Sequence, residues 1–373
     1  MKVALAHDYL TQRGGAERVA LELTRVFPGA ELFTSLYSPP DTFPEFREVP
    51  VRTSVLNRVA ALRRNFRLGL PLFGWAFGRA RAGSDAEVMV VSTTGFAHGI
   101  RTEAPTLVYC HSPARFLYLA DEYLGRRWFT SPQGWVLKAL RPPLVAWDQR
   151  AARSAAAYLC NSTVVRDRIR AVYGIEATVV PPPAGLDPAG PREPVGQLAD
   201  WPDHHLLVSR LLPYKNVDRA IDAFRALPDE RLLVVGRGPQ RDQLAARLPA
   251  NVRLAEGLSD AQLRTAYAGA RAVIAPSHED FGLTPVEGFG FGVPTLALRA
   301  GGYLDTVVEG VSGWFFDEPD AAAIASAVRR LAAEPLAREP ILEHARRFSP
   351  EVFAEALRSA AARVAAGQGG HHD

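Results

Sequence analysis

Short apolar runs alternate with longer stretches of helical character along almost the whole chain. Each run has the length and composition of a buried parallel strand, and strands that alternate with helices predict an α/β fold with parallel sheets. The runs form two series, with residues 3–6, 88–91, 106–110, 157–160 and 178–180 in the first and residues 206–209, 232–235, 252–254 and 272–275 in the second.

A segment rich in proline and glycine separates the two series. It extends from Pro181 to about Trp201 and has no apolar period, which is the composition of a linker. A chain of 373 residues also has the length of two domains. We therefore expect an N-terminal domain of residues 1–185 and a second domain of residues 186–348.

Charge and composition exclude several classes of function. A net charge of +3 is too small to indicate nucleic acid as a partner, and no run approaches the 18 apolar residues of a membrane-spanning helix. The N-terminus enters a strand at once and leaves no room for a signal peptide. Cys110 and Cys160 are the only cysteines, too few for a disulfide framework or a metal cluster. We expect an intracellular protein that binds no metal.

The polar stretch 276–287 directly follows the apolar run 272–275. It therefore leaves the carboxyl end of a strand, where open α/β sheets bind their ligands. The stretch predicts a tight turn and then a helix, with Glu279 in the loop and Glu287 in the helix. Two carboxylates there could chelate a metal, flank a glycosidic bond or accept hydrogen bonds from sugar hydroxyls. The alternative is a helix-capping Asp280 and an ordinary surface glutamate.

Other loops after predicted strands carry polar residues as well. Arg210 and Lys215 could clamp phosphate groups, although basic residues are common on surfaces. Gly14 and Gly15 precede a predicted helix, whose N-terminus could bind an anion. His111 also follows a strand, where a lone histidine is more often structural than catalytic.

The segment 52–81 is strongly basic. It holds no acidic residue and seven arginines, at positions 52, 58, 63, 64, 67, 79 and 81. Apolar residues recur at helical spacing and predict an amphipathic helix: Val55, Leu56, Val59, Leu62 and Phe66. A basic amphipathic helix is typical of a membrane interface. It is equally typical of a surface helix whose apolar stripe packs on its own domain, and the two interpretations are compatible.

The run Glu-Asp-Phe-Gly-Leu at 279–283, with Glu287 and the run Gly-Phe-Gly-Val-Pro-Thr at 290–295, resembles the donor site of family 4 glycosyltransferases. The resemblance extends from His7 to Gly313 and favours bacterial members that build surface polysaccharides. It implies the retaining mechanism and the GT-B fold of that family, an α/β fold with two Rossmann-like domains that face each other across a cleft. It also implies that a helix at 349–366 packs back on the first domain, before a disordered tail at 367–373.

The resemblance implies roles for individual residues. The expected catalytic residues are His111 and Glu279, beside the transferred sugar, and Arg210 and Lys215, beside the leaving diphosphate. The expected donor-binding residues are Gly14, Gly15, Gly236, Gly238, Glu256, Leu258, Asp280, Phe281, Gly282, Leu283, Thr284 and Glu287. The expected acceptor-binding residues are Asp8, Arg115 and Tyr118.

The reaction expected on this basis is metal-independent and uses no cofactor, because the chain has no Asp-x-Asp sequence to hold a metal against a sugar nucleotide. GDP-mannose is the favoured donor, ahead of a UDP-sugar. The expected acceptor is a glycan, free or linked to polyprenyl diphosphate, which would place the enzyme in the cytoplasm, at the anionic inner face of the cell membrane. Alternatives are an epimerase or phosphorylase of the same fold, a transferase for soluble small molecules, and an inactive binding subunit.

Overall fold

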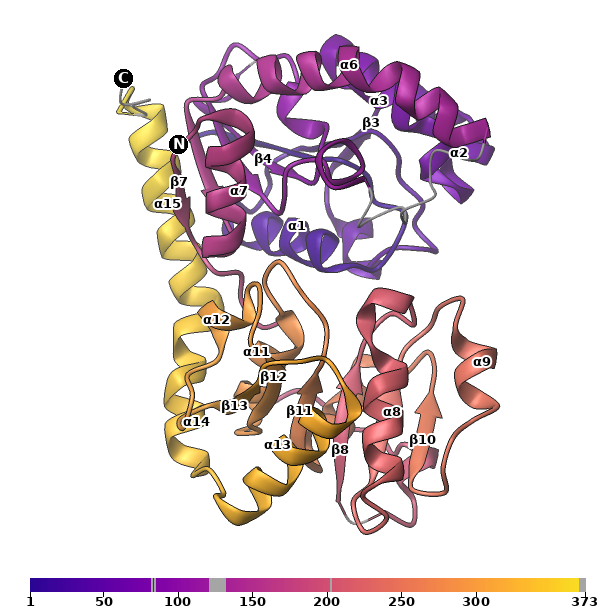
Figure 1. Ribbon diagram of the computed structural model, residues 1–373. Helices are drawn as coiled ribbons and strands as arrows, with labels where there is room; N and C mark the ends of the chain where they lie inside the picture. The colour runs from indigo at the N-terminus through magenta and orange to yellow at the C-terminus, as the bar shows by residue number, and fades with distance from the viewer. Residues whose placement is uncertain (82, 84, 121–131, 202, 369–373) are drawn as a thin grey trace. The chain divides into compact units, whose positions relative to one another are not determined.

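The computed structural model describes residues 1–368 except 82, 84, 121–131 and 202. The chain forms two compact units (Figure 1): unit 1 comprises Met1–Pro182 and Phe353–Asp373, and unit 2 comprises Pro183–Val352. Residues 369–373 of the expected disordered tail lie outside the described residues.

Unit 1 is built on a parallel sheet of seven strands in the order β3-β2-β1-β4-β5-β6-β7. The strands are β1 (Val3–His7), β2 (Leu32–Thr34), β3 (Val51–Thr53), β4 (Val88–Thr93), β5 (Thr106–Cys110), β6 (Ala157–Cys160) and β7 (Ala177–Val179). The first series of apolar runs is thus confirmed as strands. The sequence analysis missed β2 and β3, which have only three residues each.

Helices cover both faces of this sheet. They are α1 (Gly15–Val26), α2 (Ala60–Arg64), α3 (Leu70–Arg79), α4 (Arg115–Tyr118), α6 (Pro132–Arg153), α7 (Thr163–Tyr173) and α15 (Pro350–Ala365). One core contains Phe73 and Phe77 of α3 against Val91 of β4. The other contains Leu23 of α1, and it also includes Phe353, Leu357, Ala360, Ala361 and Val364 of α15.

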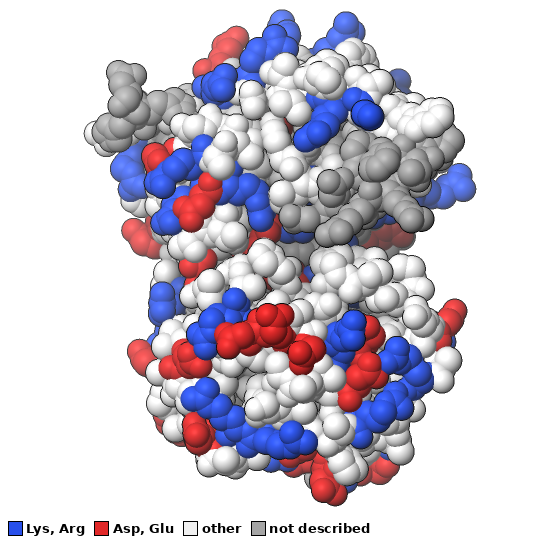
Figure 2. All heavy atoms as spheres, in the orientation of Figure 1, with Lys and Arg blue, Asp and Glu red and all other residues white. Residues whose placement is uncertain are grey.

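The prediction of one amphipathic helix between residues 52 and 81 is wrong. Two short 3-10 turns, Val55–Arg58 and Phe66–Gly69, alternate there with α2 and α3. The side chains of Ser54 and Asn65 accept hydrogen bonds from the backbone at the start of these turns, and such caps compete with a continuous helix. Leu56 and Leu62 pack into the core while Val55, Val59, Leu68, Leu72 and Trp75 remain exposed. Figure 2 shows Lys and Arg side chains across the top of unit 1, where Figure 1 places α3 and α6.

Unit 2 repeats the architecture with six parallel strands in the order β10-β9-β8-β11-β12-β13. They are β8 (His204–Val208), β9 (Leu232–Val235), β10 (Val252–Ala255), β11 (Ala270–Ala275), β12 (Thr295–Leu298) and β13 (Gly313–Phe316). The helices are α8 (Val217–Arg225), α9 (Arg241–Ala245), α10 (Asp260–Ala268), α11 (Leu283–Gly290), α12 (Tyr303–Thr306), α13 (Ala321–Ala333) and α14 (Arg338–Ala345). The second series of apolar runs is confirmed as β8 to β11, whereas β12 and β13, with four residues each, were not predicted. Both units are Rossmann-like.

Each sheet has one place where neighbouring strands are not consecutive and the direction of winding reverses. In unit 1 this switch lies between β1 and β4, and in unit 2 it lies between β8 and β11. Loops that leave the carboxyl ends of such strand pairs diverge and leave a crevice, which is where open α/β sheets bind ligands. The two switch points are therefore the expected positions of a ligand site.

Candidate active site

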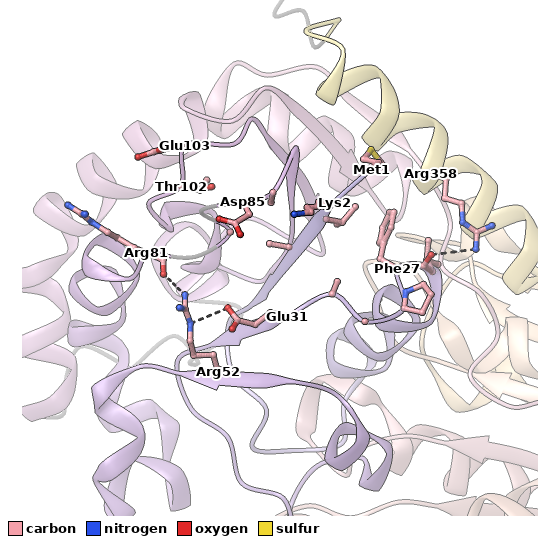
Figure 3. Close-up of a pocket in the computed structure, with 18 of the residues that line it drawn as sticks. Met1, Lys2, Phe27, Glu31, Arg52, Arg81, Asp85, Thr102, Glu103 and Arg358 are labelled. Carbon is pink, nitrogen blue, oxygen red and sulfur yellow. Dashed lines mark hydrogen bonds and ion pairs between the residues drawn. The ribbon is translucent and has the colours of Figure 1, made fainter.

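A wide depression of about 1340 Å³ lies in unit 1, but at the opposite edge of its sheet (Figure 3). Its lining includes Met1 and Lys2 before β1, and Asp85 and Ala86 before β4. Arg52 crosses it to pair with Glu31 at 3.2 Å and donates to the carbonyl oxygen of Arg81. The amino ends of the strands meet here, and none of the predicted site residues lines this depression.

At the switch point of unit 2, Lys215 and Glu279 form an ion pair. Lys215 belongs to the loop after β8 and Glu279 to the loop after β11, and the Lys215 Nζ donates to Glu279 Oε1. Ser277 Oγ donates to the same carboxylate oxygen over 2.6 Å. Lys215 is only 7% exposed, so this pair is largely withdrawn from water. The structure thus brings together two of the predicted catalytic residues.

The backbone around Lys215 is fixed by Asn216. Its φ of 54° is left-handed, and among the described residues it is the one residue other than glycine with a positive φ. The Asn216 side chain donates to the carbonyl oxygen of Pro276 over 2.9 Å. This bond joins the loop after β8 to the loop after β11, which positions Lys215 against Glu279.

Arg210, the other predicted basic residue, is exposed and donates to Tyr214 Oη over 3.2 Å. The Nζ of Lys215 lies 5.0 Å from the centroid of the Tyr214 ring. Tyr214 therefore contacts both cations of the predicted clamp. The sequence analysis did not single it out, although it stands directly before Lys215 in the chain.

Gly236 and Gly238 follow β9 and approach the loop after β8. A side chain at Gly236 would collide with the carbonyl oxygen of Ser209, and one at Gly238 would collide with that of Leu211. Both glycines are thus explained by backbone packing, and their contact with a donor stays a prediction. Arg237 lies between them, with its guanidinium against Gly257.

The turn between β11 and α11 depends on Gly282. Its φ of 96° is left-handed, and it is the N-cap of α11, so the alternative of a helix-capping Asp280 is wrong. Asp280 and Phe281 are buried. Leu283 and Thr284 are partly exposed in the first turn of α11, and Thr284 Oγ1 donates to the Val208 carbonyl oxygen over 3.4 Å.

Glu287 lies on α11 and is partly buried, so it is not an ordinary surface residue. Its Oε2 accepts a hydrogen bond of 2.8 Å from Tyr267 Oη. After β10, Glu256 Oε1 accepts from Arg241 Nε over 3.2 Å, and Leu258 is partly exposed. The donor-binding roles of these residues remain predictions.

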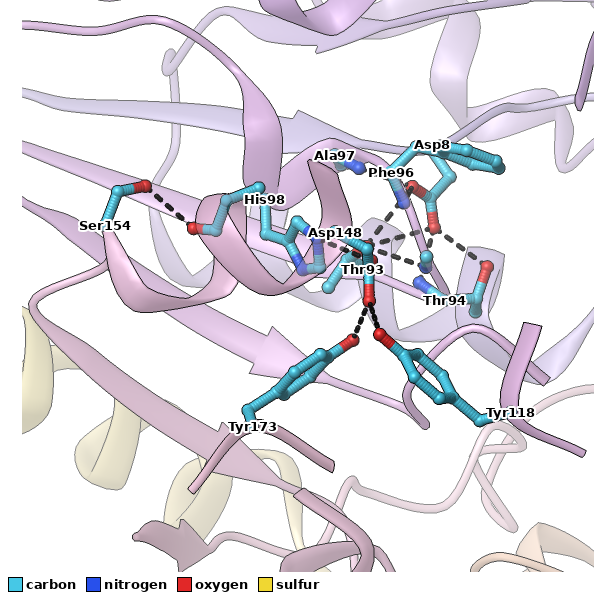
Figure 4. A network of polar contacts seen from close by, with 12 residues as sticks. Asp8, Thr93, Thr94, Phe96, Ala97, His98, Tyr118, Asp148, Ser154 and Tyr173 are labelled. Carbon is cyan, nitrogen blue, oxygen red and sulfur yellow. Dashed lines mark hydrogen bonds and ion pairs between the residues drawn. The ribbon is translucent and has the colours of Figure 1, made fainter. Parts of the chain in front are cut away.

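At the switch point of unit 1, the carboxylate of Asp8 organises the loop after β4 (Figure 4). Its Oδ1 accepts from the backbone N–H groups of Phe96 and Ala97 over 2.9 and 2.7 Å. Its Oδ2 accepts from the hydroxyl of Thr94 over 2.8 Å and from the Thr94 backbone N–H. Asp8 is 1% exposed, which favours positioning of the loop over direct contact with an acceptor.

His111 follows β5 and is also buried. Its backbone N–H donates to the Thr93 carbonyl oxygen over 2.9 Å, and its carbonyl oxygen accepts from Asn161 over 3.4 Å. Its Nε2 lies 2.9 Å from Ser92 Oγ. His111 and Asp8 are thus held by neighbouring parts of the β4 segment, which the sequence analysis did not single out.

Tyr118, predicted to bind an acceptor, joins a buried polar network (Figure 4). Its hydroxyl donates to Asp148 Oδ2 over 2.7 Å, the Tyr173 hydroxyl donates to the same oxygen over 2.8 Å, and His98 Nε2 lies 3.0 Å from Asp148 Oδ1. Burial and the Asp148 charge raise the pKa of Tyr118. Arg115, at the start of the same helix, is partly exposed.

Gly14 is the N-cap of α1 and Gly15 its first residue, as the sequence predicts. The unexpected feature there is Glu17, which is 1% exposed. Gln12 donates to its Oε1 over 3.0 Å, while its Oε2 points at Gly14, where a β-carbon would lie 2.5 Å away. Burial raises the pKa of Glu17 to about 7.

Two family models match the chain. The model described as Glycosyltransferase Family 4 matches residues 13–187, and the model described as Glycosyl transferases group 1 matches residues 199–349. The first match includes the candidate residues from Gly14 to Tyr118, and the second includes those from Arg210 to Glu287.

Curated relatives align with part of the chain. A glycogen synthase of Pseudomonas aeruginosa is 35% identical over 132 residues, which cover 33% of this chain and 26% of the relative. A GDP-mannose-dependent alpha-(1-6)-phosphatidylinositol monomannoside mannosyltransferase of Mycolicibacterium smegmatis is 31% identical over 202 residues, which cover 47% of this chain and 52% of the relative. The aligned part thus spans about half or less of each relative.

Solved structures match over almost the whole chain. The Anabaena protein HepE in complex with UDP has a TM-score of 0.69 at 18% identity, covering 96% of this chain and 99% of that one. A sucrose-phosphate synthase from Thermosynechococcus elongatus has a TM-score of 0.73 at 19% identity, covering 98% of this chain and 99% of that one. At such identities the likeness concerns the fold alone.

Proposed function

The chain belongs to the glycosyltransferases, with a family 4 domain followed by a group 1 domain in the GT-B fold, and we propose that it moves a hexose from a nucleotide-diphosphate sugar to a hydroxyl group. Mannose from GDP-mannose is the donor we favour, since one relative is described as GDP-mannose-dependent. A UDP-sugar is the second choice, because HepE was solved with UDP. The proposed acceptor is a lipid-linked glycan.

The ion pair of Lys215 with Glu279 is the observation that carries this proposal. An ammonium group has three donor protons, so Lys215 can keep its bond to Glu279 and still donate to a phosphate oxygen. The same pair would then hold the diphosphate through Lys215 and the sugar hydroxyls through Glu279. That arrangement joins the leaving group and the migrating sugar at one point.

Departure of the nucleoside diphosphate builds up negative charge, which Arg210 and Lys215 would stabilise. Fixed donors aimed at developing charge contribute about 2.7–4 kcal/mol each in other enzymes. No metal is needed in this scheme, and we expect excess EDTA to leave most of the activity in place. If EDTA abolished the activity and magnesium or manganese restored it, the metal-independent scheme would be contradicted.

Transfer would proceed on the front face of the sugar with retention of configuration. The departing phosphate takes the proton of the acceptor hydroxyl as that oxygen bonds to the anomeric carbon and the bond to the diphosphate breaks. Glu287 would bind the ribose, and the bond from Tyr267 fixes its carboxylate for this role. His111 would contact the sugar beside the reacting carbon.

Membrane association is part of the proposal, because a lipid-linked acceptor lies in a bilayer. Among the described residues, no helix combines the length and apolar character needed to cross one. The segment 52–81 offers another route, since Arg58, Arg64 and Arg67 are exposed beside the exposed apolar residues Val59 and Leu68. Trp75 is 46% exposed and can enter an interface, whereas Phe77 is fully buried and cannot.

The test begins with donor binding. GDP, UDP, GDP-mannose and UDP-glucose are compared by thermal shift. A ligand at a hundred times its dissociation constant adds roughly 2.7 kcal/mol to the free energy of unfolding. Release of GDP or UDP is then measured with and without polyprenyl-diphosphate-linked sugars. Release only with these acceptors supports transfer. Turnover of the nucleotide sugar without them indicates another reaction, and no shift with any of the four ligands contradicts the proposal.

A further inference from the structure

Ser92 links two buried histidines in unit 1. His7 ends β1, Ser92 lies beside it on β4, and His111 follows β5. The Ser92 Oγ lies 2.9 Å from His7 Nδ1 and 2.9 Å from His111 Nε2. The exposed fractions are 1% for His7, 0% for Ser92 and 9% for His111, so water does not replace these bonds. The chemistry of the partner atoms fixes the direction of each hydrogen bond.

The first proton belongs to His7. Its Nδ1 lies 3.2 Å from the Ser92 carbonyl oxygen as well as 2.9 Å from the hydroxyl oxygen. A carbonyl oxygen can only accept, so Nδ1 must carry a hydrogen, which it shares between the two oxygens. The hydroxyl of Ser92 therefore accepts from His7. Burial lowers the pKa of His7 against the opposing effect of Asp8, which keeps the His7 ring neutral.

The second proton belongs to the Ser92 hydroxyl, which has one hydrogen to donate. Within the part of the chain that the structure describes, His111 Nε2 is the acceptor available to that hydrogen. If Nε2 carried a hydrogen of its own, the buried hydroxyl hydrogen would lose its acceptor, at a cost of about 1–3 kcal/mol. The favoured arrangement has a bare Nε2, and the ring proton of His111 then lies on Nδ1.

We propose that His7 and Ser92 are positioning residues that hold His111 as a neutral imidazole with its proton on Nδ1. His111 cannot take a proton at Nε2 unless Ser92 rotates away, so the ring acts as a fixed hydrogen-bond donor and not as a base at that nitrogen. This fits front-face transfer, in which the departing phosphate takes the acceptor proton. The catalytic consequence rests on the proposed function, whereas the proton positions rest on the geometry of unit 1.

The proton positions can be measured by NMR of the full chain labelled with nitrogen-15, because bare and protonated ring nitrogens have well-separated shifts. The protein contains its own references. His204 Nε2 and His344 Nε2 face the carbonyl oxygens of Ala266 and Thr306 at 2.9 and 2.7 Å, so both nitrogens must carry hydrogens. We expect the opposite pattern for His111, assigned by loss of its signals in His111→Asn. A protonated Nε2 in His111 would overturn the proposal.

Substitutions at Ser92 and at His7 test this positioning of His111. Ser92→Ala should let the two neutral forms of His111 interconvert, and we expect kcat to fall roughly 10- to 100-fold, the range seen when outer partners of metal-ligating histidines are removed. The KM for the nucleotide sugar should stay within about twofold. His7→Asn places an amide N–H near the position of Nδ1 and should retain most activity, whereas His7→Leu should behave like Ser92→Ala. The matched control is Ser312→Ala, which removes an equally buried hydroxyl from unit 2.

The two proposals fail separately. An unchanged His111 spectrum in Ser92→Ala overturns the proposed positioning of His111 by Ser92. A changed spectrum with unchanged kcat overturns it as well. If neither GDP-mannose nor UDP-glucose is turned over by the parent protein, the proposed function is contradicted. The spectrum of the parent protein still decides where the His111 proton lies.

Discussion

Lys215 and Glu279 neutralise each other at the end of β8 and β11, so removal of either leaves an unpaired charge in a partly buried loop. We expect Lys215→Ala to lower transfer by about 100-fold or more, because it removes the donor proposed for the leaving diphosphate. Arg219→Ala is the matched control, since it removes an exposed charge four residues further along. Turnover and GDP affinity are measured in both variants, and a Lys215→Ala enzyme with parental turnover would remove this lysine from the mechanism.

The two glutamates should differ in their effect on kinetics. Glu279→Gln keeps the shape of the side chain but weakens contact with Lys215 and with sugar hydroxyls, so we expect mainly a lower kcat. Glu287→Gln keeps an oxygen for Tyr267 and should mainly raise the KM for the donor, because ribose binding is the same before and during reaction. Equal, modest rises in KM for both variants would show that this division of roles is wrong.

Glu17 should make stability depend on pH. Its pKa is 4.5 in the unfolded chain and about 7 in the folded protein. Between these values the folded state keeps a proton that the unfolded state has lost, so the free energy of unfolding falls as pH rises from about 4.5 to 7. The shift corresponds to a loss of about 3 kcal/mol above pH 7. Glu17→Gln should therefore stabilise the protein more at pH 8 than at pH 5 in urea unfolding, and an equal effect at both pH values would contradict this.

Sequence reasoning found single site residues but not the contacts between them. Arg210, Lys215 and Glu279 could be chosen because each follows a predicted strand. The ion pair between Lys215 and Glu279 joins residues 64 positions apart and requires β8 to lie beside β11, an adjacency that apolar runs do not reveal. Ser92 and Tyr267 escaped notice for the same reason, since their importance comes only from the side chains that they meet.

At the level of elements, strand length and local capping explain part of what could be predicted. Most strands found from the sequence have four to six residues, whereas the missed β2 and β3 have three. Length is not the whole reason, because β7 has three residues and was found, while β12 and β13 have four and were missed. In the segment 52–81 the apolar spacing is helical, but the caps at Ser54 and Asn65 divide it into short turns. The spacing of apolar residues indicates which side chains share a face. It does not indicate where a side chain takes over a backbone hydrogen bond and ends a helix.

The turn after β9 offers a test at the same level. A β-carbon at Gly238 would collide with the Leu211 carbonyl oxygen and force this turn away from the loop that carries Arg210. We expect Gly238→Ala to lower the free energy of unfolding by about 1–3 kcal/mol and to weaken GDP binding. Gly196→Ala is the control, because a β-carbon there meets nothing within 4 Å. Chemical unfolding and thermal shift with GDP measure the two effects, and parental values in Gly238→Ala would contradict the packing argument.

Across the whole molecule, the two units use the same position of their sheets. In unit 1 the β1–β4 switch point carries His7, Asp8 and Ser92, and in unit 2 the β8–β11 switch point carries Lys215 and Glu279. Open α/β sheets bind their ligands there, because the loops diverge at that point. The repeated strand–helix alternation predicted two such units, and the position of the candidate residues follows from strand order.

Membrane binding is the prediction that concerns the whole molecule. Each arginine near an anionic surface contributes about 1 kcal/mol, so Arg58, Arg64 and Arg67 together should raise vesicle binding on the order of a hundredfold. We expect co-sedimentation with vesicles that contain phosphatidylglycerol, not with phosphatidylcholine alone, and weaker binding as salt rises.

The triple variant with Arg58, Arg64 and Arg67 replaced by Gln should lose this binding and still glycosylate a short soluble acceptor, because its donor site is untouched. Its matched control replaces Arg219, Arg329 and Arg346 in unit 2, which removes the same charge from another part of the exposed surface. Equal losses in both variants would mean that net charge, not the segment 52–81, governs binding. Absence of vesicle binding by the parent protein would instead favour a soluble acceptor.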